Sequence, residues 1–332
     1  MRTLSRIFAS SRPWPAAEPA GGRRWAKYVA IARPDHWFKN VFMLPGTVVA
    51  ALLIRVPLER FAGRLALGLL SACLIASANY VINEWLDAEF DRFHPVKRNR
   101  PSVAGGLEPE AVYAEYGLLL AAGLALAWLI SPFFFASASL LGVMGVLYNV
   151  RPFRSKDRVY LDVLSESVNN PIRLLLGWFV VSDWPLPPSS LLMAYWMGGA
   201  FLMGVKRYSE YRFLEDVETA GLYRRSFRFY TEETLLISSF FYALCASFFL
   251  GVFLVKYRIE LLLSLPLLAC MFAWYLWLGM KPDSPAQRPE HLYRETSFIS
   301  FVALVVVVMA ALLFVDIPSL RWFLNNSFIS AP

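Results

Sequence analysis

An asparagine and two aspartates recur at four-residue intervals in one segment of the chain. On an α-helix this spacing places Asn83, Asp87 and Asp91 on one face. Clustered carboxylates repel one another and are costly near hydrocarbon, so they need a counter-charge. A Mg²⁺ ion that bridges to a diphosphate would supply it, because magnesium takes oxygen ligands from one or two carboxylates and from substrate phosphates. A solvated, acidic helix end is the alternative interpretation.

Basic residues follow this acidic motif directly: Arg92, His94, Lys97, Arg98 and Arg100. Arginine binds phosphate through two parallel hydrogen bonds, and lysine supplies a compact charge. The segment therefore predicts an anion site beside the carboxylates. The general excess of Lys and Arg in cytoplasmic loops accounts for part of the same pattern.

A second polar stripe lies further along the chain, with members three or four residues apart: Asp162, Glu166, Asn169, Asn170 and Arg173. Ionisable groups inside a spanning helix usually face a cavity and mark function. A second loop suited to phosphate precedes the stripe and contains Tyr148, Arg151, Arg154, Lys156 and Arg158. Two alternatives stay open. A transporter could carry the same stripe, and Arg173 could simply neutralise Glu166 within the bundle.

A third polar segment begins with Lys206 and Arg207 and continues to Thr231. We expect Lys206 and Arg207 to lie on a cytoplasmic loop outside both acidic motifs, where they add cations to the same face of the membrane. Taken alone, the segment is weakly informative, and a solvated loop explains it equally well.

The elements that must position these residues are membrane-spanning helices. The 332 residues are 57% hydrophobic and 17% charged, with a mean hydropathy of +0.47, which excludes an ordinary soluble domain. About nine stretches are long and apolar enough to span a bilayer. The predicted spans are residues 40–56, 64–86, 114–130, 132–149, 161–181, 188–205, 234–255, 260–279 and 297–315.

The distribution of basic residues predicts the orientation of these spans. Alternate loops on the N-terminal side hold about 25 Lys and Arg and the other loops about 6, so we expect a cytoplasmic N-terminus in an inner membrane. Residues 1–35 are expected to form a flexible basic arm, residues 36–320 one catalytic domain, and residues 321–332 a short tail. The three cysteines show no pairing or metal-ligand spacing.

Together, these motifs resemble the UbiA superfamily of intramembrane prenyltransferases, whose nine-helix fold carries an Asn-x-x-x-Asp-x-x-x-Asp motif and a second acidic motif on cytoplasmic helix ends. Within it, the chain looks like the decaprenyl-phosphate phosphoribosyltransferases. The matching segments are residues 33–40, 80–101, 156–173, 206–210 and 230–231. The run from Asn83 to Pro101 is the most specific of them. Glu84 and Trp85 depart from the usual residues after the motif asparagine.

The resemblance implies an all-α membrane enzyme with a cytoplasm-facing site, a phosphoribosyl diphosphate donor and a polyprenyl phosphate acceptor. Asn83, Asp87 and Asp91 would hold Mg²⁺, and Asp162 would orient the ribose or a second metal ion. The acceptor is already an anion, so no general base is required. The substrate-binding candidates are Lys39, Asn40, Tyr80, Lys97, Arg98, Arg100, Tyr148, Lys156, Glu166, Arg173, Lys206 and Arg207.

Two rival functions remain open from the sequence. A prenyltransferase would keep the fold and the metal site but use a prenyl diphosphate donor with an aromatic or lipid acceptor. A transporter or lipid flippase would use the stripe from Asp162 to Arg173 as a pathway, although the charged motifs gather on one face of the membrane. No nucleic-acid partner is expected. The polyprenyl length and the oligomeric state are not encoded in these motifs.

Overall fold

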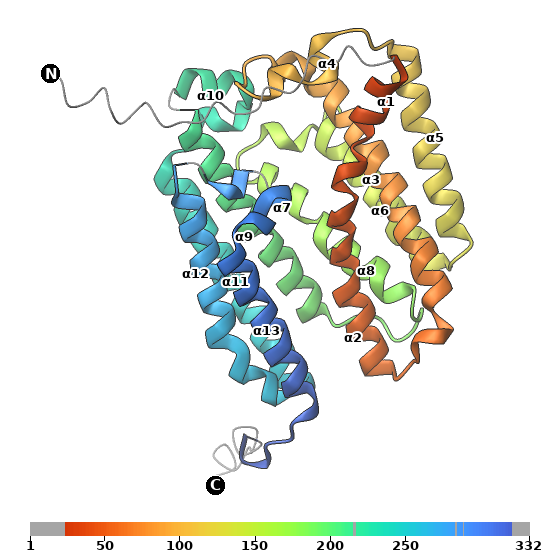
Figure 1. Ribbon diagram of the computed structural model, residues 1–332, viewed down its shortest axis with the longest axis vertical. Helices are drawn as coiled ribbons and strands as arrows, with labels where there is room; N and C mark the ends of the chain where they lie inside the picture. The colour runs from red at the N-terminus through yellow and green to blue at the C-terminus, as the bar shows by residue number, and fades with distance from the viewer. Residues whose placement is uncertain (1–23, 215–216, 283, 288, 321–332) are drawn as a thin grey trace, which may run out of the picture.

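The computed structural model describes residues 24–214, 217–282, 284–287 and 289–320, and all regular structure within these ranges is helical (Figure 1). The N-terminal half packs around α3, which contacts both α5 and α6. The helices of this half are α1 (Arg24–Ala32), η1 (Pro34–Met43), α2 (Leu44–Ile54), α3 (Ala62–Asp91), α4 (Pro101–Ala104), α5 (Pro109–Trp128) and α6 (Pro132–Asn149).

The C-terminal half packs around α9, which has its most extensive contacts with α11. Its helices are α7 (Leu161–Ser167), α8 (Asn169–Phe179), α9 (Ser189–Phe213), α10 (Val217–Tyr223), α11 (Glu232–Tyr257), α12 (Leu265–Met280) and α13 (Thr296–Phe314). In Figure 1, the blue helices α11 to α13 stand on the side of the molecule opposite α3 and α5, with α8 and α9 between them.

Seven of the described helical segments are long and apolar enough to cross a membrane. They are Trp25–Ile54, Ala62–Asp91, Pro109–Trp128, Pro132–Asn149, Glu232–Tyr257, Ile259–Met280 and Thr296–Phe314. The predicted spans 161–181 and 188–205 are helical but are not among the seven. The first of them is divided into α7 and α8 and carries the polar stripe, so its hydropathy is low. The protein is therefore an all-helical, multi-pass membrane protein, and the count of nine spans stays a prediction.

The described part of the predicted N-terminal arm is helical. Residues 24–32 form α1, where the Lys27 ammonium donates to the Gly105 carbonyl at 3.0 Å and the Tyr28 hydroxyl accepts from the Glu108 backbone N–H at 3.1 Å. These contacts reach about 80 residues along the chain, so the composition of the arm could not reveal them. Residues 1–23 of the predicted arm and the tail 321–332 lie outside the described residues.

Close packing fixes α8 against α2 and thereby positions the polar stripe. A Cβ atom added at Gly177 would lie 1.8 Å from the Met43 carbonyl oxygen, so the backbones can approach this closely only at glycine. The Thr47 hydroxyl donates to the Gly177 carbonyl at 2.9 Å. The polar residues of α8 are therefore held against η1 and α2.

Candidate active site

The first acidic motif lies on the last two turns of α3, as the four-residue spacing predicted. Asn83 donates from Nδ2 to Asp87 Oδ2 at 3.1 Å and to Asn149 Oδ1 at 2.6 Å. Asp87 Oδ1 accepts from Arg154 Nη2 at 2.8 Å and lies 2.6 Å from Lys156 Nζ. Asp91 is paired with Arg100. Each aspartate of the motif is thus in direct contact with a cation.

The donor set of this motif fits a magnesium ion that is shared with a substrate. Two carboxylates and one amide oxygen project from one helix face, and Mg²⁺ commonly takes one or two carboxylates plus phosphate oxygens. A metal centre held by protein alone does not fit, because no three His, Cys, Asp or Glu side chains of the described residues are grouped to hold a metal ion. The flanking cations suit the phosphate groups that such a substrate would bring.

Lys156 links the second basic loop to the first acidic motif. Its ammonium contacts both Asp87 and Asn149 Oδ1, each at 2.6 Å, although only 4% of its side chain is exposed. Burial lowers the pKa of this ammonium to about 8; Asp87 opposes that change, while Arg154 and Arg224 add to it. Lys156 is therefore charged at neutral pH and loses its proton at moderately alkaline pH.

This pKa predicts a pH dependence of donor use. The kcat/KM for the donor reports ionisations of the free enzyme, so it should fall by about tenfold per pH unit above pH 8 as Lys156 becomes neutral. In the Lys156→Arg variant the cation persists, so this fall in kcat/KM should be absent between pH 7 and 9. The measurement is initial rate against donor concentration at each pH. If kcat/KM of Lys156→Arg falls with rising pH as it does in wild type, another group causes the fall.

The second acidic motif is held by a network around one arginine. The Arg207 side chain, only 2% exposed, pairs with Asp162 at 3.6 Å, with Glu210 at 2.9 Å and with Glu166. The Tyr148 hydroxyl donates to Glu166 at 2.6 Å. Asp162 is completely buried and accepts hydrogen bonds from Ser226 at 3.1 Å and Tyr230 at 2.8 Å. Asp162 therefore anchors the segment that follows α10.

The expected loop position of Lys206 and Arg207 is wrong. Both residues lie within α9, which continues to Phe213, and Arg207 is paired with the second acidic motif instead of lying outside it. The helix extends because hydropathy marks only the apolar part of α9, whereas intrahelical hydrogen bonds continue beyond it. Lys206 is half-buried, and no carboxylate of the described residues pairs with its ammonium.

Arg173 does not neutralise Glu166, because Arg207 already does so. Instead, Arg173 donates from Nε to Asn40 Oδ1 at 3.1 Å and from Nη1 to the Asn169 carbonyl. Asn40 belongs to η1, which also carries Lys39. The Lys39 ammonium lies 3.2 Å from His36 Nδ1 and 5.8 Å from the centre of the Tyr80 ring. These candidates therefore form a polar group between η1, α3 and α8.

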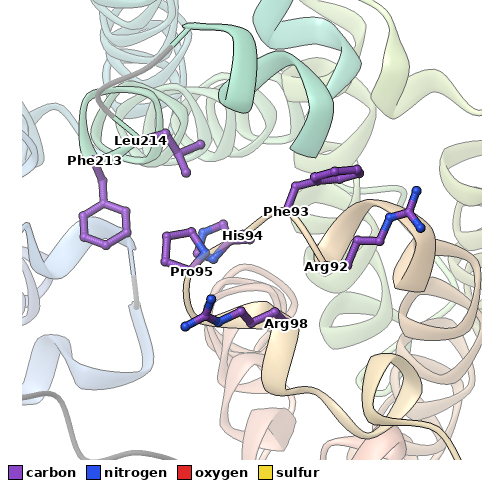
Figure 2. A pocket seen from close by; sticks show the side chains of 7 residues that line it. All are labelled: Arg92, Phe93, His94, Pro95, Arg98, Phe213 and Leu214. Atoms are coloured by element: carbon purple, nitrogen blue, oxygen red, sulfur yellow. The ribbon is translucent and has the colours of Figure 1, made fainter.

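Lys97 and Arg98, both in the first basic loop, contact different parts of the protein. Lys97 bonds Glu210 at 3.2 Å and also contacts Tyr223, so it belongs to the network that contains Arg207. Arg98 is exposed and lines a separate pocket of about 280 Å³ with Arg92, Phe93, His94, Pro95, Phe213 and Leu214 (Figure 2). Arg98 therefore does not join the paired carboxylates as the spacing predicted.

Sequence reasoning missed Asn149 and Arg33 as contributors to this site, and it named Arg154 only as part of the second basic loop. Arg154 pairs with Asp87, Asn149 joins Asn83 to Lys156, and Arg33 pairs with Glu84. Arg33 has a left-handed backbone, with a φ of 48°. Glu84, noted above as a departure from the usual motif, is 2% exposed and has Arg33, whose side chain is 15% exposed, as its counter-ion. The unusual glutamate directly after the motif asparagine was the sequence signal that could have pointed to Arg33.

The fold and the site define a multi-pass membrane transferase with two acidic motifs and intervening cations at one end of its bundle. The sequence model of the UbiA prenyltransferase family matches residues 43–302, and the chain belongs to this family. The predicted resemblance is thereby confirmed.

Relatives and solved structures agree with this family. A decaprenyl-phosphate phosphoribosyltransferase of Mycolicibacterium smegmatis is 33% identical over 212 residues, which are 62% of this chain and 63% of that protein, less than two thirds of its length. A protein of the same name from Mycobacterium tuberculosis is 29% identical over 63% of this chain and 68% of its own. A UbiA homolog from Archaeoglobus fulgidus, solved with GPP and Mg²⁺, has the same fold, with a TM-score of 0.65, 23% identity, and coverage of 87% of this chain and 100% of its own.

Proposed function

We propose that this protein transfers 5-phosphoribose from phosphoribosyl diphosphate to a polyprenyl phosphate in a Mg²⁺-dependent reaction that releases diphosphate. The observation that carries the proposal is the contact of both motif aspartates with cations, Asp87 with Arg154 and Lys156 and Asp91 with Arg100. Carboxylates and cations that alternate in this way suit a metal-bound diphosphate. The names of the mycobacterial relatives support this donor and a decaprenyl phosphate acceptor.

The reaction replaces one bond at C1 of the ribose. The C1–O bond to diphosphate breaks, its electron pair leaves with the diphosphate, and an oxygen of the lipid phosphate bonds to C1. Asn83, Asp87 and Asp91 would hold Mg²⁺, which supplies charge neutralisation for the leaving group. Lys156, Arg154 and Arg100 would bind phosphate oxygens. The protein contributes orientation and preorganised charge, and attack opposite the leaving group inverts C1.

An excess of cations supports a donor with a second phosphate group. Among the described residues, no carboxylate lies within ion-pairing distance of Arg173 or Lys206. A prenyl diphosphate would bring one diphosphate, whereas phosphoribosyl diphosphate adds a 5-phosphate and the acceptor adds a third phosphate. Cations without an ion pair at these two positions fit the more highly charged pair of substrates.

The rival proposal is a prenyl diphosphate donor. It is favoured by the A. fulgidus homolog, which was solved with GPP and Mg²⁺. We expect purified protein in lipid nanodiscs to transfer label from phosphoribosyl diphosphate to decaprenyl phosphate only when Mg²⁺ is present. Parallel reactions contain labelled geranyl diphosphate or geranylgeranyl diphosphate. Consumption of a prenyl diphosphate with no use of phosphoribosyl diphosphate would overturn the proposal and leave only the family assignment.

We also propose that the site faces the cytoplasm from an inner membrane, with residues 36–320 as the catalytic domain. Single cysteines at positions 95 and 155 should then react with an impermeant maleimide only in inside-out vesicles, and a cysteine at 184 only in right-side-out cells. The predicted cytoplasmic positions 215 and 288 lie outside the described residues. Labelling of 95 and 155 from opposite sides would contradict a single site.

A further inference from the structure

Arg224 lies between the two acidic motifs and is held in place by its own segment. It joins α10 to the short helix η5 (Arg225–Arg228), and its backbone N–H donates to the Ala220 carbonyl at 2.9 Å. The guanidinium carbon is 5.8 Å from the centres of the Tyr223 and Phe227 rings. Two residues further on, Ser226 is tied to Asp162. The side chain is therefore oriented by aromatic packing and by an anchored backbone.

Two of the three guanidinium nitrogens of Arg224 have no hydrogen-bond acceptor among the described residues. Its Nε and Nη1 atoms are buried, and no described residue offers either of them an acceptor. Two neighbouring arginines do form ion pairs, Arg154 with Asp87 and Arg207 with Glu166. A buried guanidinium with two unsatisfied donors is costly in a folded protein unless an acceptor arrives.

The position of Arg224 identifies which acceptor could arrive. It lines one small cavity together with both motif aspartates, Arg154 and Lys156. Its charge is close enough to lower the pKa of the Lys156 ammonium. Nε and Nη1 of a guanidinium donate from different edges of its plane, so they can bind separate oxygens of a diphosphate. The cavity thus presents oxygen ligands for a cation on α3 and donors for an anion on the facing segment.

We propose that Arg224 binds the diphosphate group of the donor and holds it against the face of α3 that carries Asp87 and Asp91. The inference rests on the proposed function only in that the donor carries a diphosphate, and a prenyl diphosphate would satisfy it equally. As the bond to diphosphate breaks, negative charge grows on the leaving oxygen, and hydrogen-bond donors already in place stabilise that charge. The 5-phosphate of the donor and the lipid phosphate bind other cations.

The test measures binding of inorganic diphosphate and of ribose 5-phosphate separately, in the detergent-solubilised full chain with Mg²⁺. Arg224→Ala should weaken Mg²⁺-diphosphate binding by about tenfold or more and leave ribose 5-phosphate binding within about twofold of wild type. Arg224→Lys keeps the charge but loses the planar guanidinium with its separate donors, so its diphosphate affinity should lie between those of Arg224→Ala and wild type. Arg228→Ala, an exposed arginine on η5, is the matched control and should bind both ligands like wild type.

Two results would overturn the inference: unchanged diphosphate binding in Arg224→Ala, or equal weakening of both ligands. If Arg224→Ala does not fold, Arg224→Lys decides by the same comparison. Because the ligand is inorganic diphosphate, the result does not depend on the donor. An enzyme that uses a prenyl diphosphate would refute the proposed function and leave the role of Arg224 intact. Wild-type diphosphate affinity in Arg224→Ala would refute the role of Arg224 and leave the proposed function intact.

Discussion

Asp87→Asn and Asp91→Asn should each lower kcat/KM for transfer by on the order of 10³-fold or more, while the protein remains inserted in the membrane. Asparagine keeps the shape of the side chain but removes the charge that a metal-bound diphosphate requires. The alanine variants should likewise abolish turnover. The measurement is the rate of transfer at saturating Mg²⁺, accompanied by size-exclusion chromatography and a melting curve.

Glu89→Ala is the matched control for both variants. Glu89 lies on the same helical turns of α3, but its side chain is 61% exposed. Among the described residues, its ion-pair partner is Arg151, at 3.6 Å. Exposed pairs contribute little, so this variant should retain activity and melting temperature. Activity of Asp87→Asn or Asp91→Asn within a few-fold of wild type would refute the metal assignment.

Arg207→Ala should destabilise the protein, with a free energy of unfolding lower by about 3–5 kcal/mol, because it leaves buried carboxylates without their counter-ion. Arg207 is the ion-pair partner that the structure gives for Asp162 and Glu166, and Glu210 would retain only Lys97. The expected result is a clearly lower melting temperature in detergent and a loss of monodisperse protein. Arg207→Lys should recover part of the stability, since one ammonium cannot reach all three carboxylates in the same geometry.

Lys206→Ala provides the contrast at the adjacent position. No described carboxylate pairs with Lys206, so its removal should leave the melting temperature close to that of wild type. The same variant should raise the KM for the donor by about tenfold, because a charge-assisted phosphate contact contributes about 1.5–3 kcal/mol. Equal melting temperatures of Arg207→Ala and Lys206→Ala would show that the carboxylate network does not stabilise the fold.

The sequence by itself determined the class of fold and the first acidic motif. Hydropathy marks a spanning segment locally, and Ser131-Pro132 correctly separated two spans that became α5 and α6. The common face of Asn83, Asp87 and Asp91 also follows from local geometry, since residues four apart on one helix must be neighbours. No knowledge of the other helices is needed for either conclusion.

Only the tertiary structure decided which cation meets which carboxylate. Arg154 and Asp87 are 67 residues apart, and Arg207 and Glu166 are 41 residues apart, so no local periodicity relates them. Lys206 and Arg207 look interchangeable in the sequence, yet consecutive positions on α9 point in different directions, and only one reaches the carboxylates. Arg224 likewise reads as one basic residue among several until the packed helices bury its donors beside the acidic motif, because burial is a property of the assembled bundle.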